Sequence, residues 1–390
     1  MELRPGYKQT ELGVLPDDWK VVPLSSVCSM KSGETITSSY ISSNGSYPCY
    51  GGNGLRGYTA RFTHEGSFCL IGRQGALCGN VFEVNGRFFA SEHAVVVTAN
   101  PEIFIPWLTY VLRDMNLNQY SESSAQPGLS VAKLALLPIA CPPFSEQKAI
   151  AAALSDVDAL LDSLGALIAK KRDMKKAAMQ ELLTGKTRLP GFSGAWVEKS
   201  VDELAELGND RIIPFKTPKC KLCVELEHIV PNEGKLCGHT KPSLVSTTKS
   251  AFEVENILFG RLRAYLKKFW FADSPGACST EIWVLKARKE CVAPRLLYYL
   301  IQTQDFIDAS SVTYGTHMPR SEWKTVKDVA FRIPENLEEQ QAIADVLSDM
   351  DAEIEALEVR YAKVKDMKTG MMQELLTGKT RLVPTGEQHG

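Results

Sequence analysis

Two stretches of the chain carry the hydrophobic pattern of a long helix with one narrow apolar stripe. In both stretches, apolar residues recur at alternating steps of four and three positions, which is the 3.5-residue repeat of a coiled-coil seam. The first stretch has them at Ile150, Leu154, Val157, Leu161, Leu164 and Ile168, and the second at Ile343, Leu347, Met350, Ile354, Leu357 and Tyr361. A stripe this narrow suits packing against another helix, so we predict that the two helices pair with each other.

Helix start and stop signals agree with this pattern. Pro142, Pro143 and Pro334 precede the two stretches, and Gly185 and Gly378 stand near their ends as C-cap candidates. Each helix is therefore expected to be about 40 residues long and to span roughly 60 Å. Lys171, Lys175 and Lys368 interrupt the stripes before apolar residues resume.

The remaining residues show a different pattern, with short β-like runs broken by turn residues. SFCLIG, RFFASEHAVVVT, KLCVELEHIV and STEIWVLK are such runs, and short helices are expected near residues 107–116 and 295–308. We predict an α+β fold with two similar globular domains separated by two long helices. The expected boundaries are 1–144 for the first domain, 145–188 for the central helix, 189–337 for the second domain, and 338–390 for the C-terminal helix and tail.

The long helices are an internal duplication. The string MQELLTGKTRL occurs at residues 179–189 and again at 372–382, a spacing of 372 − 179 = 193, and residues 146–189 share 27 identities in 44 positions with residues 339–382. The globular domains resemble each other less. Gly72-Arg73 matches Gly260-Arg261, and Pro106 and Tyr110 match Pro294 and Tyr298, all at an offset of 188. One domain fold was thus used twice.

Composition leaves nucleic-acid binding open. Lys plus Arg number 44 against 46 Asp plus Glu, a net charge of −2, but phosphate binding needs only local positive surface. Local clusters occur at Lys170, Lys171, Arg172, Lys175 and Lys176, at Lys216, Lys219 and Lys221, and at Arg261, Arg263, Lys267 and Lys268. The sequence shows neither a membrane-length apolar run nor a secretory leader, and its ten cysteines are scattered, so we expect a cytoplasmic protein with reduced thiols.

Several enzyme-like motifs fail on their context. Thr184-Gly185-Lys186-Thr187 ends like a phosphate-binding loop but closes a helix, and Gln180 stands where the loop needs glycine. The string GNGLRG at residues 52–57 fits the dinucleotide fingerprint, but no helix-forming sequence follows, so a glycine-rich turn is expected. No catalytic residues are predicted.

A zinc site remains an open question in the second domain. Its candidate ligands are Cys220, Cys223, Cys237 and His239. The second pair has one intervening residue where structural zinc prefers two to four, and the first pair lies beside an alternating strand. We therefore predict no metal.

Several phrases together resemble specificity subunits of type I restriction-modification systems. They are YKQTELGVLPDDW, YPCYGGNGLRGY, LIGRQGALCGNVF, LFGRLRAYLKK, VELEHIVP, SEQKAIAAALSDVDALLD and both copies of MQELLTGKTRL. The resemblance implies two target recognition domains on long helices that pair as an antiparallel coiled coil. It also implies a bipartite target in double-stranded DNA, with two short half-sites around an unspecified spacer.

The same resemblance implies partner enzymes rather than catalysis in this chain. Two methyltransferase subunits would bring S-adenosylmethionine, and restriction subunits would bring the ATP- and Mg²⁺-dependent activities. The competing interpretations are a bivalent protein adaptor held together by the coiled coil and a stand-alone nuclease that uses dispersed carboxylates.

Base reading needs Arg, Asn, Gln or Lys on turn-rich segments that can enter a groove, and phosphate contacts need Arg or Lys. In the first domain these considerations select Asn53, Arg56, Arg73, Gln74, His93 and Gln126, and in the second Lys241, Arg261, Arg263, Lys267, His317 and Arg320. Arg73 and Arg261 occupy matching Gly-Arg positions, so a structural role is equally open for them. With the helices as a ruler, half-site centres are expected about one helical turn apart, roughly 34 Å or 10 base pairs.

Overall fold

The computed structural model describes residues 4–75, 77–121, 128–312 and 319–382. The chain divides into two compact units, each made of two pieces of sequence. Unit 1 comprises residues 1–165 and 359–390, and unit 2 comprises residues 166–358. Two 39-residue helices, α3 (Phe144–Leu182) and α8 (Leu337–Leu375), belong to both units, with one part of each helix in each unit. Their length agrees with the prediction of about 40 residues.

Unit 1 is built on a six-stranded mixed sheet of order β4-β9-β7-β8-β5-β6, in which only the β5–β8 pair is parallel. The strands are β1 (Tyr7–Thr10), β2 (Gly13–Pro16), β3 (Lys20–Pro23), β4 (Cys28–Ser32), β5 (Tyr47–Gly51), β6 (Gly54–Thr59), β7 (His64–Gly72), β8 (Val81–Ala90), β9 (Ala94–Ala99) and β10 (Pro138–Cys141). The helices are α1 (Ile105–Asp114), α2 (Val131–Ala135) and the parts of α3 and α8 that belong to this unit.

Alternating residues of the central strands of this sheet supply two apolar cores. On one face, Cys69 and Ile71 of β7 pack with Trp107 of α1 and with Ile150 of α3. On the other face, Leu70 packs with a smaller apolar cluster. Because successive side chains of a strand point to opposite faces, this buried strand needs the continuous apolar run that the sequence shows.

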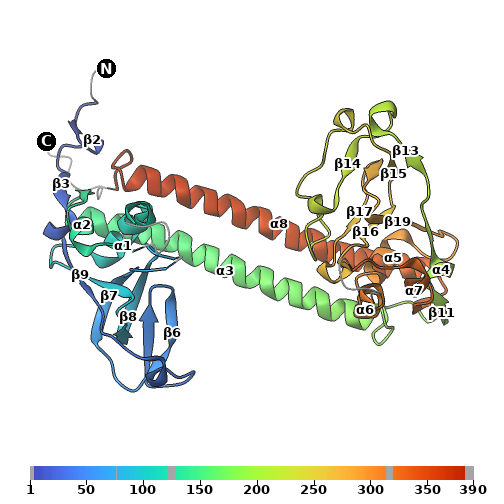
Figure 1. The fold of residues 1–390 in the computed structure, drawn as a ribbon, viewed down its shortest axis with the longest axis horizontal. Helices are drawn as coiled ribbons and strands as arrows, with labels where there is room; N and C mark the ends of the chain where they lie inside the picture. Colours follow the sequence, from blue (N-terminus) through green and yellow to red (C-terminus); the bar gives the residue numbers. More distant parts are fainter. Residues whose placement is uncertain (1–3, 76, 122–127, 313–318, 383–390) are drawn as a thin grey trace. The chain divides into compact units, whose positions relative to one another are not determined.

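Unit 2 has a similar plan, but its strands are shorter and form two four-stranded sheets in place of one six-stranded sheet. Its strands are β11 (Trp196–Ser200), β12 (Ala205–Leu207), β13 (Arg211–Ile212), β14 (Leu222–Val224), β15 (Lys249–Phe252), β16 (Ile257–Gly260), β17 (Phe269–Phe271), β18 (Gly276–Cys278), β19 (Ile282–Ala287) and β20 (Ala330–Pro334). Its helices are α4 (Val201–Leu204), α5 (Pro294–Leu300), α6 (Gln304–Ser311) and α7 (Trp323–Val326), with the remaining parts of α3 and α8. Phe259 and Leu285 face the core that contains α5 and α6, and Leu258 and Val284 face a second cluster. The sheets are β12-β19-β16-β17, β13-β15-β18-β14 and the β11–β20 pair. Figure 1 labels several of these strands, among them β14, β15, β16 and β19.

The predicted seam residues are buried or half-buried, but they serve two surfaces. Ile150 and Leu154 join the core under α1, and Ile343 and Leu347 join the core under α5. Further along α3, Val157, Leu161, Leu164 and Ile168 are buried, as is Ile354 on α8, whereas Met350, Leu357 and Tyr361 are half-buried. The first stripe residues of each helix thus pack in the core of a domain, and the later ones are buried or half-buried along the helices, as a seam would require.

Interhelical contacts show that the two helices run antiparallel within each unit. In unit 1, Asp158 and Gly165 of α3 lie against Lys368 and Tyr361 of α8, respectively. In unit 2, Lys171 and Lys175 of α3 pair with Glu353 and Asp351 of α8, respectively. The residue number increases along α3 as the number of its contact residue on α8 decreases. The predicted α+β architecture with an antiparallel helix pair is confirmed.

One predicted equivalence between the domains is wrong by a residue. Helix α1 begins at Ile105 and α5 at Pro294, an offset of 294 − 105 = 189 rather than 188. Accordingly Tyr299, and not Tyr298, makes the contact that Tyr110 makes in unit 1, since each donates its hydroxyl hydrogen bond to an aspartate of the following long helix. The predicted Gly-Arg match at an offset of 188 does agree with the structure, because β7 ends at Gly72 and β16 at Gly260.

Candidate nucleic-acid interface

Four of the residues selected in the first domain come together where β7 ends. The backbone N–H of Arg73 donates to the carbonyl oxygen of His93 (2.9 Å), and the side chains of Gln74 and His93 are joined through Oε1 and Nδ1 (3.2 Å). The β5–β6 turn that carries Asn53 packs against this pair, because a Cβ added at Gly52 would lie 3.1 Å from the His93 carbonyl oxygen. Glycine permits the close approach.

The exposure of these side chains distinguishes those that could contact another molecule from those that are held by the protein itself. Asn53, Arg56 and Gln74 are exposed, whereas Arg73 and His93 are half-buried. Arg73 Nη1 donates to the Ser32 hydroxyl on β4 (3.0 Å), which holds its side chain against the sheet. The exposed amides and guanidinium are therefore the groups of this cluster best placed to meet another molecule. Gln126 and His317 lie outside the described residues.

A corresponding cluster forms where β16 ends in unit 2. The backbone N–H of Arg261 donates to the carbonyl oxygen of Glu281 (2.9 Å), as Arg73 does to His93, and 281 − 93 = 188. Arg320 forms a two-bonded ion pair with the Glu281 carboxylate, with Nε–Oε2 at 2.9 Å and Nη2–Oε1 at 3.0 Å. Arg263 donates its backbone N–H to the Pro319 carbonyl oxygen, which brings this residue into the same cluster.

Two details of this cluster concern unusual backbone and an unsatisfied donor. Arg263 and Lys267 both adopt positive φ angles, 53° and 51°, and they flank a short 3-10 turn. The guanidinium of Arg261 lies over the Trp283 ring, with 5.8 Å from Cζ to the ring centroid, and its buried Nε has no acceptor among the described residues. A buried donor without an acceptor is costly and often marks a functional position.

Lys241 belongs to a different part of unit 2. It precedes the 3-10 turn Pro242–Leu244, which lies beside the 3-10 turn Pro214–Lys216. Both turns present a large apolar side chain, with Phe215 64% and Leu244 76% exposed. Sequence reasoning did not select these two residues, although a phenylalanine in a lysine-rich segment was a signal for them.

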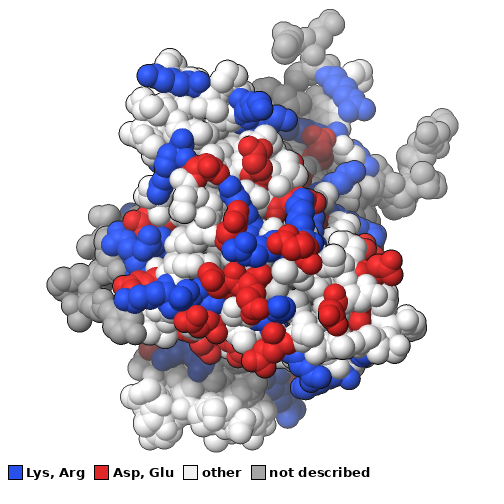
Figure 2. All heavy atoms as spheres, turned by 90° about the vertical axis from the view of Figure 1, so that its right-hand side faces the viewer, with Lys and Arg blue, Asp and Glu red and all other residues white. Residues whose placement is uncertain are grey.

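The lysines around these apolar side chains are exposed and free of ion pairs within the described part of the chain. They are Lys216, Lys219, Lys221 and Lys241. Elsewhere in unit 2 many lysines are neutralised, for example Lys249 by Glu225 and Lys286 by Asp210. Figure 2 shows Lys and Arg side chains separated by uncharged surface in the upper part of unit 2, and intermixed with acidic side chains lower down. The lysine-rich turns are therefore a second candidate surface for phosphate contacts.

Each long helix is anchored to its domain by a buried carboxylate. Glu146 accepts hydrogen bonds from Trp19 Nε1 (2.9 Å) and from Nε and Nη2 of Arg381 (2.7 and 2.8 Å). In unit 2, Glu339 likewise accepts from Arg188 (3.0 and 2.6 Å) and from Trp196 Nε1 (3.3 Å). The two carboxylates are 193 residues apart, as are the two arginines. The duplication therefore conserved the joint between domain and helix.

The enzyme-like motifs have structural roles in the described residues. Gly52 and Asn53 form the turn between β5 and β6, as expected for a glycine-rich turn. Gly185 follows the end of α3 with a φ of 70°. Burial raises the pKa of the Cys28 thiol to about 11 and that of Cys223 to about 12, so these thiols are protonated, poor nucleophiles near neutral pH.

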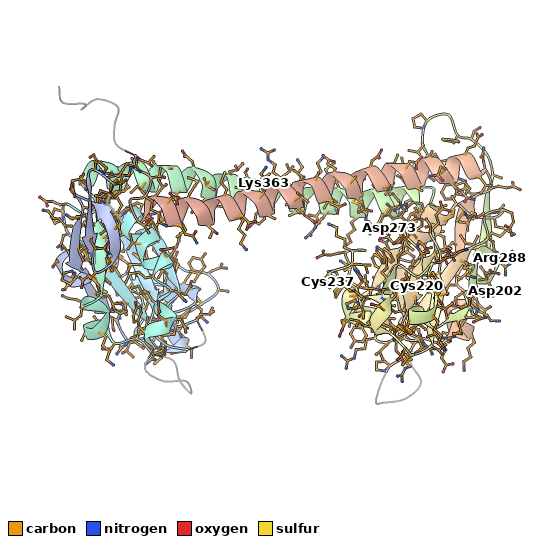
Figure 3. All side chains as sticks on the ribbon, turned by 90° about the horizontal axis from the view of Figure 1, so that it is seen from above. Asp202, Cys220, Cys237, Asp273, Arg288 and Lys363 are labelled. Carbon is orange, nitrogen blue, oxygen red and sulfur yellow. The ribbon has the colours of Figure 1, made fainter. Side chains whose placement is uncertain are left out.

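The four zinc candidates do not form a ligand set. Cys220 and Cys223 contact each other through their thiols, whereas the exposed Cys237 directs its Sγ to the carbonyl oxygens of Glu227 and His228. Figure 3 marks Cys220 and Cys237 in unit 2. The described residues contain no group of three or more His, Cys, Asp or Glu side chains that could hold a metal ion. They also contain no helix with the length and apolarity needed to cross a membrane.

Two like α+β units, each anchored to a pair of antiparallel helices and each bearing a basic loop cluster at the same place, define a double-headed recognition scaffold. The family model described as Type I restriction modification DNA specificity domain matches residues 16–170 and 194–366. The chain belongs to this family of type I restriction-modification specificity subunits.

Individual relatives agree with this assignment. The EcoprrI specificity subunit of Escherichia coli is 47% identical over 150 residues, which cover 36% of this chain and 36% of that subunit. The EcoDI specificity subunit of Escherichia coli is 21% identical over 408 residues, covering 94% of this chain and 90% of that subunit. The crystal structure of the type I system S subunit from M. genitalium has the same fold, with a TM-score of 0.65 at 15% identity over 96% of this chain and 98% of that one.

Proposed function

We propose that this chain chooses the DNA target of a type I restriction-modification complex, with unit 1 reading one half-site and unit 2 the other. The observation that carries the proposal is the pair of equivalent loop clusters with different side chains. The framework positions Arg73 and Arg261 are shared, but Gln74 and His93 in unit 1 correspond at the offset of 188 to Leu262 and Glu281 in unit 2. One scaffold with two sets of reading groups fits a target with two different halves.

The loop clusters at the ends of β7 and β16 carry different polar side chains, so we expect them to make different contacts with DNA. Exposed Gln74 and Asn53 offer the paired donor and acceptor that match an adenine edge, whereas exposed Arg263 offers a guanidinium group that matches guanine or phosphate. Arg320 is paired with Glu281, so it would contact DNA through the part of its guanidinium that this ion pair leaves free. The unpaired lysines around Lys241 add contacts to the backbone that carry no sequence information. Substitution at a reading residue should therefore relax one target position, and substitution of these lysines should weaken all sequences alike.

The chain acts through partner enzymes in this proposal. Methyltransferase subunits holding S-adenosylmethionine would modify the site, and restriction subunits would cut unmodified DNA. Met174 on α3 and Met367 on α8 are 46% and 49% exposed and are equivalent in the duplication, since 367 − 174 = 193. Two equivalent exposed apolar side chains suit two copies of the same partner.

The test is a complex assembled from this chain and its methyltransferase partner. Methylated positions on genomic DNA should define one bipartite motif, and Gln74→Ala should degrade one half of it while leaving the other half intact. Lys219→Ala is the control, expected to lower affinity without changing the motif. The chain alone, with DNA, S-adenosylmethionine and Mg²⁺, should neither methylate nor cut. Activity of the chain alone, or an unaltered motif with every reading-residue variant, would overturn the proposal.

Docking is tested separately with Met174→Asp and Met367→Asp. Each single variant should reduce the partner stoichiometry from two to one in native mass spectrometry, and the double variant should abolish assembly. Full assembly of the double variant would show that the partner docks elsewhere.

A further inference from the structure

A polar site interrupts the helix pairing of unit 1 and joins three helices. Asp158 of α3 accepts a hydrogen bond from the Tyr110 hydroxyl of α1 (2.7 Å at Oδ2) and pairs with Lys368 of α8 (2.5 Å at Oδ1). The ammonium of Lys368 also lies 5.5 Å from the centroid of the Tyr110 ring. A single carboxylate thus connects the domain helix to both long helices.

Unit 2 contains the same site built from the equivalent residues. Asp351 of α8 accepts from the Tyr299 hydroxyl of α5 (2.9 Å) and pairs with Lys175 of α3 (2.6 Å). The Lys175 ammonium lies 5.3 Å from the Tyr299 ring centroid. We refer to Tyr110, Asp158 and Lys368 as lock 1, and to Tyr299, Asp351 and Lys175 as lock 2.

The two locks are related by the duplication, and the two halves of the chain exchange the residues that they contribute. Asp351 is Asp158 plus 193, and Lys368 is Lys175 plus 193. Each half of the chain therefore gives the tyrosine and aspartate to one lock and the lysine to the other. This reciprocal arrangement is the one found in an isologous interface, where residue i contacts j and the equivalent of j contacts the equivalent of i.

Both locks correspond to one pairing register. The positions that meet add up to the same number, 158 + 368 = 526 in lock 1 and 175 + 351 = 526 in lock 2. Gly165 faces the Tyr361 ring, with a built Cβ at 3.8 Å, and again 165 + 361 = 526. The lock residues are 17 positions apart on both helices, since 175 − 158 and 368 − 351 are equal. Neither helix needs a bulge to satisfy both locks.

Other registers would leave these charges without partners. A shift of α8 by one heptad would place Tyr361 or Leu375 opposite Asp158. The side chains of Lys368 and Lys175 are only 20% and 17% exposed, so a lost partner would leave a largely desolvated ammonium. An apolar seam tolerates a heptad shift, whereas a polar residue within it specifies register at some cost in stability.

The tyrosines tie the recognition domains to the same register. Burial, together with the neighbouring aspartate, raises the pKa of Tyr110 and of Tyr299, so both hydroxyls remain protonated donors. The other ion pairs between α3 and α8 in the described residues, such as Lys171–Glu353, are confined to unit 2, because position 364 is Val and position 160 is Leu. Among the ion pairs between α3 and α8 in the described residues, the aspartate–lysine pairs of the locks are those present in both copies.

We propose that the two locks fix the pairing register of α3 with α8 and thereby determine which DNA spacer length the chain accepts. The register part stands on the contacts alone, whereas the spacer part rests on the proposed function. The residues of lock 1 and lock 2 are positioning residues. They influence DNA selection through the helices and do not contact bases.

The register is measured directly by disulfide formation in the full-length chain. Cysteines at positions 165 and 361 (G165C/Y361C) report the native register, and R172C/Y361C reports a shift of one heptad, since 172 + 361 = 526 + 7. Mapping the cross-linked peptides distinguishes these disulfides from those of native cysteines. In an otherwise unaltered chain the first pair should cross-link and the second should not.

Adding K175Q and K368Q should lower the native cross-link severalfold and raise the shifted one. The charge exchange D158K/K368D, with D351K/K175D, should restore the native cross-link. K171Q is the matched control, because it removes an interhelical ion pair outside the locks, and it should leave the pattern unchanged. If the lysine variants aggregate, Y110F/Y299F removes only the two hydroxyl groups and should give a smaller change in the same direction.

The spacer is measured with the assembled methyltransferase complex and DNA of randomised spacer length. K175Q/K368Q should accept several lengths where the unaltered complex accepts one, and the charge exchange should narrow the choice again. A lower melting temperature with both readouts unchanged would show that the locks only stabilise the fold. If the unaltered complex selects no bipartite target, the proposed function fails, and the cross-links still decide the register.

Discussion

Lengthening both helices by the same number of residues should lengthen the spacer that the complex selects. The insertion site follows from the register, since positions 166 and 360 add up to 526, as do 167 and 359. Equal insertions between Ala166 and Leu167 and between Val359 and Arg360 therefore stay opposite each other, and they fall close to the boundary between the two compact units. Whole heptads preserve the seam and both locks.

The magnitude follows from helix and duplex geometry. Three heptads add 21 residues, or about 32 Å at 1.5 Å per residue, and one turn of DNA measures about 34 to 36 Å in 10 to 10.5 base pairs. If the helix pair runs along the duplex, the preferred spacer should grow by about nine or ten base pairs. Because this is nearly a whole turn, both domains would still meet the same side of the duplex.

A single heptad should behave differently. It adds about 10 Å, or about three base pairs, and three base pairs rotate the second half-site by roughly 100° about the DNA axis. Because the second half-site turns about the DNA axis while the helix seam is unchanged, affinity should fall at every spacer length. Selection from a spacer library, followed by sequencing, measures both variants.

Two outcomes bear on the reasoning. The same 21 residues inserted at Gly191, in the loop after α3, should leave the spacer unchanged, because that loop is outside the helix pair. If the variant with three heptads in each helix still prefers the original spacer, the helices do not act as a ruler and the argument is refuted.

Three further outcomes are expected. Iodoacetamide near neutral pH should label the exposed Cys237 first and leave Cys223 unmodified, because burial raises the pKa of Cys223 to about 12; peptide mass spectrometry would show the order. Glu339→Ala should lower the free energy of unfolding by ~3 kcal/mol, since it leaves Arg188 without its carboxylate partner; a loss below ~1 kcal/mol in denaturant titrations would contradict this. Leu161→Asp should broaden spacer tolerance without altering either half-site, because it places a charge in the buried seam; an unchanged spacer distribution would count against a seam role.

Sequence periodicity alone was enough to predict the two long helices and their buried stripe. The steps of four and three positions depend only on local helix geometry, and α3 and α8 both have 39 residues. The duplication also indicated two like domains, because a shared fold preserves glycine-arginine turns such as Gly72-Arg73 and Gly260-Arg261 at the same strand ends. These features depend on residues that are close together in the sequence, so they can be recognised without a structure.

Part of the candidate interface was also predictable. Turn residues with hydrogen-bonding side chains were the right class, and Gln74 and His93 do meet where β7 ends. Lys241 was grouped with Arg263 on residue type alone, although it belongs to separate turns beside Phe215. Which loops meet depends on strand order, and composition carries no information about that.

The locks show what only the tertiary structure decided. In the sequence, Lys175 and Lys368 were interruptions of an apolar stripe, and Tyr110 was matched with Tyr298 instead of Tyr299. Adjacent residues of a helix point about 100° apart, so a shift of one residue decides which hydroxyl can reach Asp351. The partner of Lys175 is 176 residues away along the chain, and the partner of Lys368 is 210 residues away. Local sequence specified the two helices and their apolar faces, whereas the charges and hydroxyls that fix one register acquired their partners only when distant segments packed together.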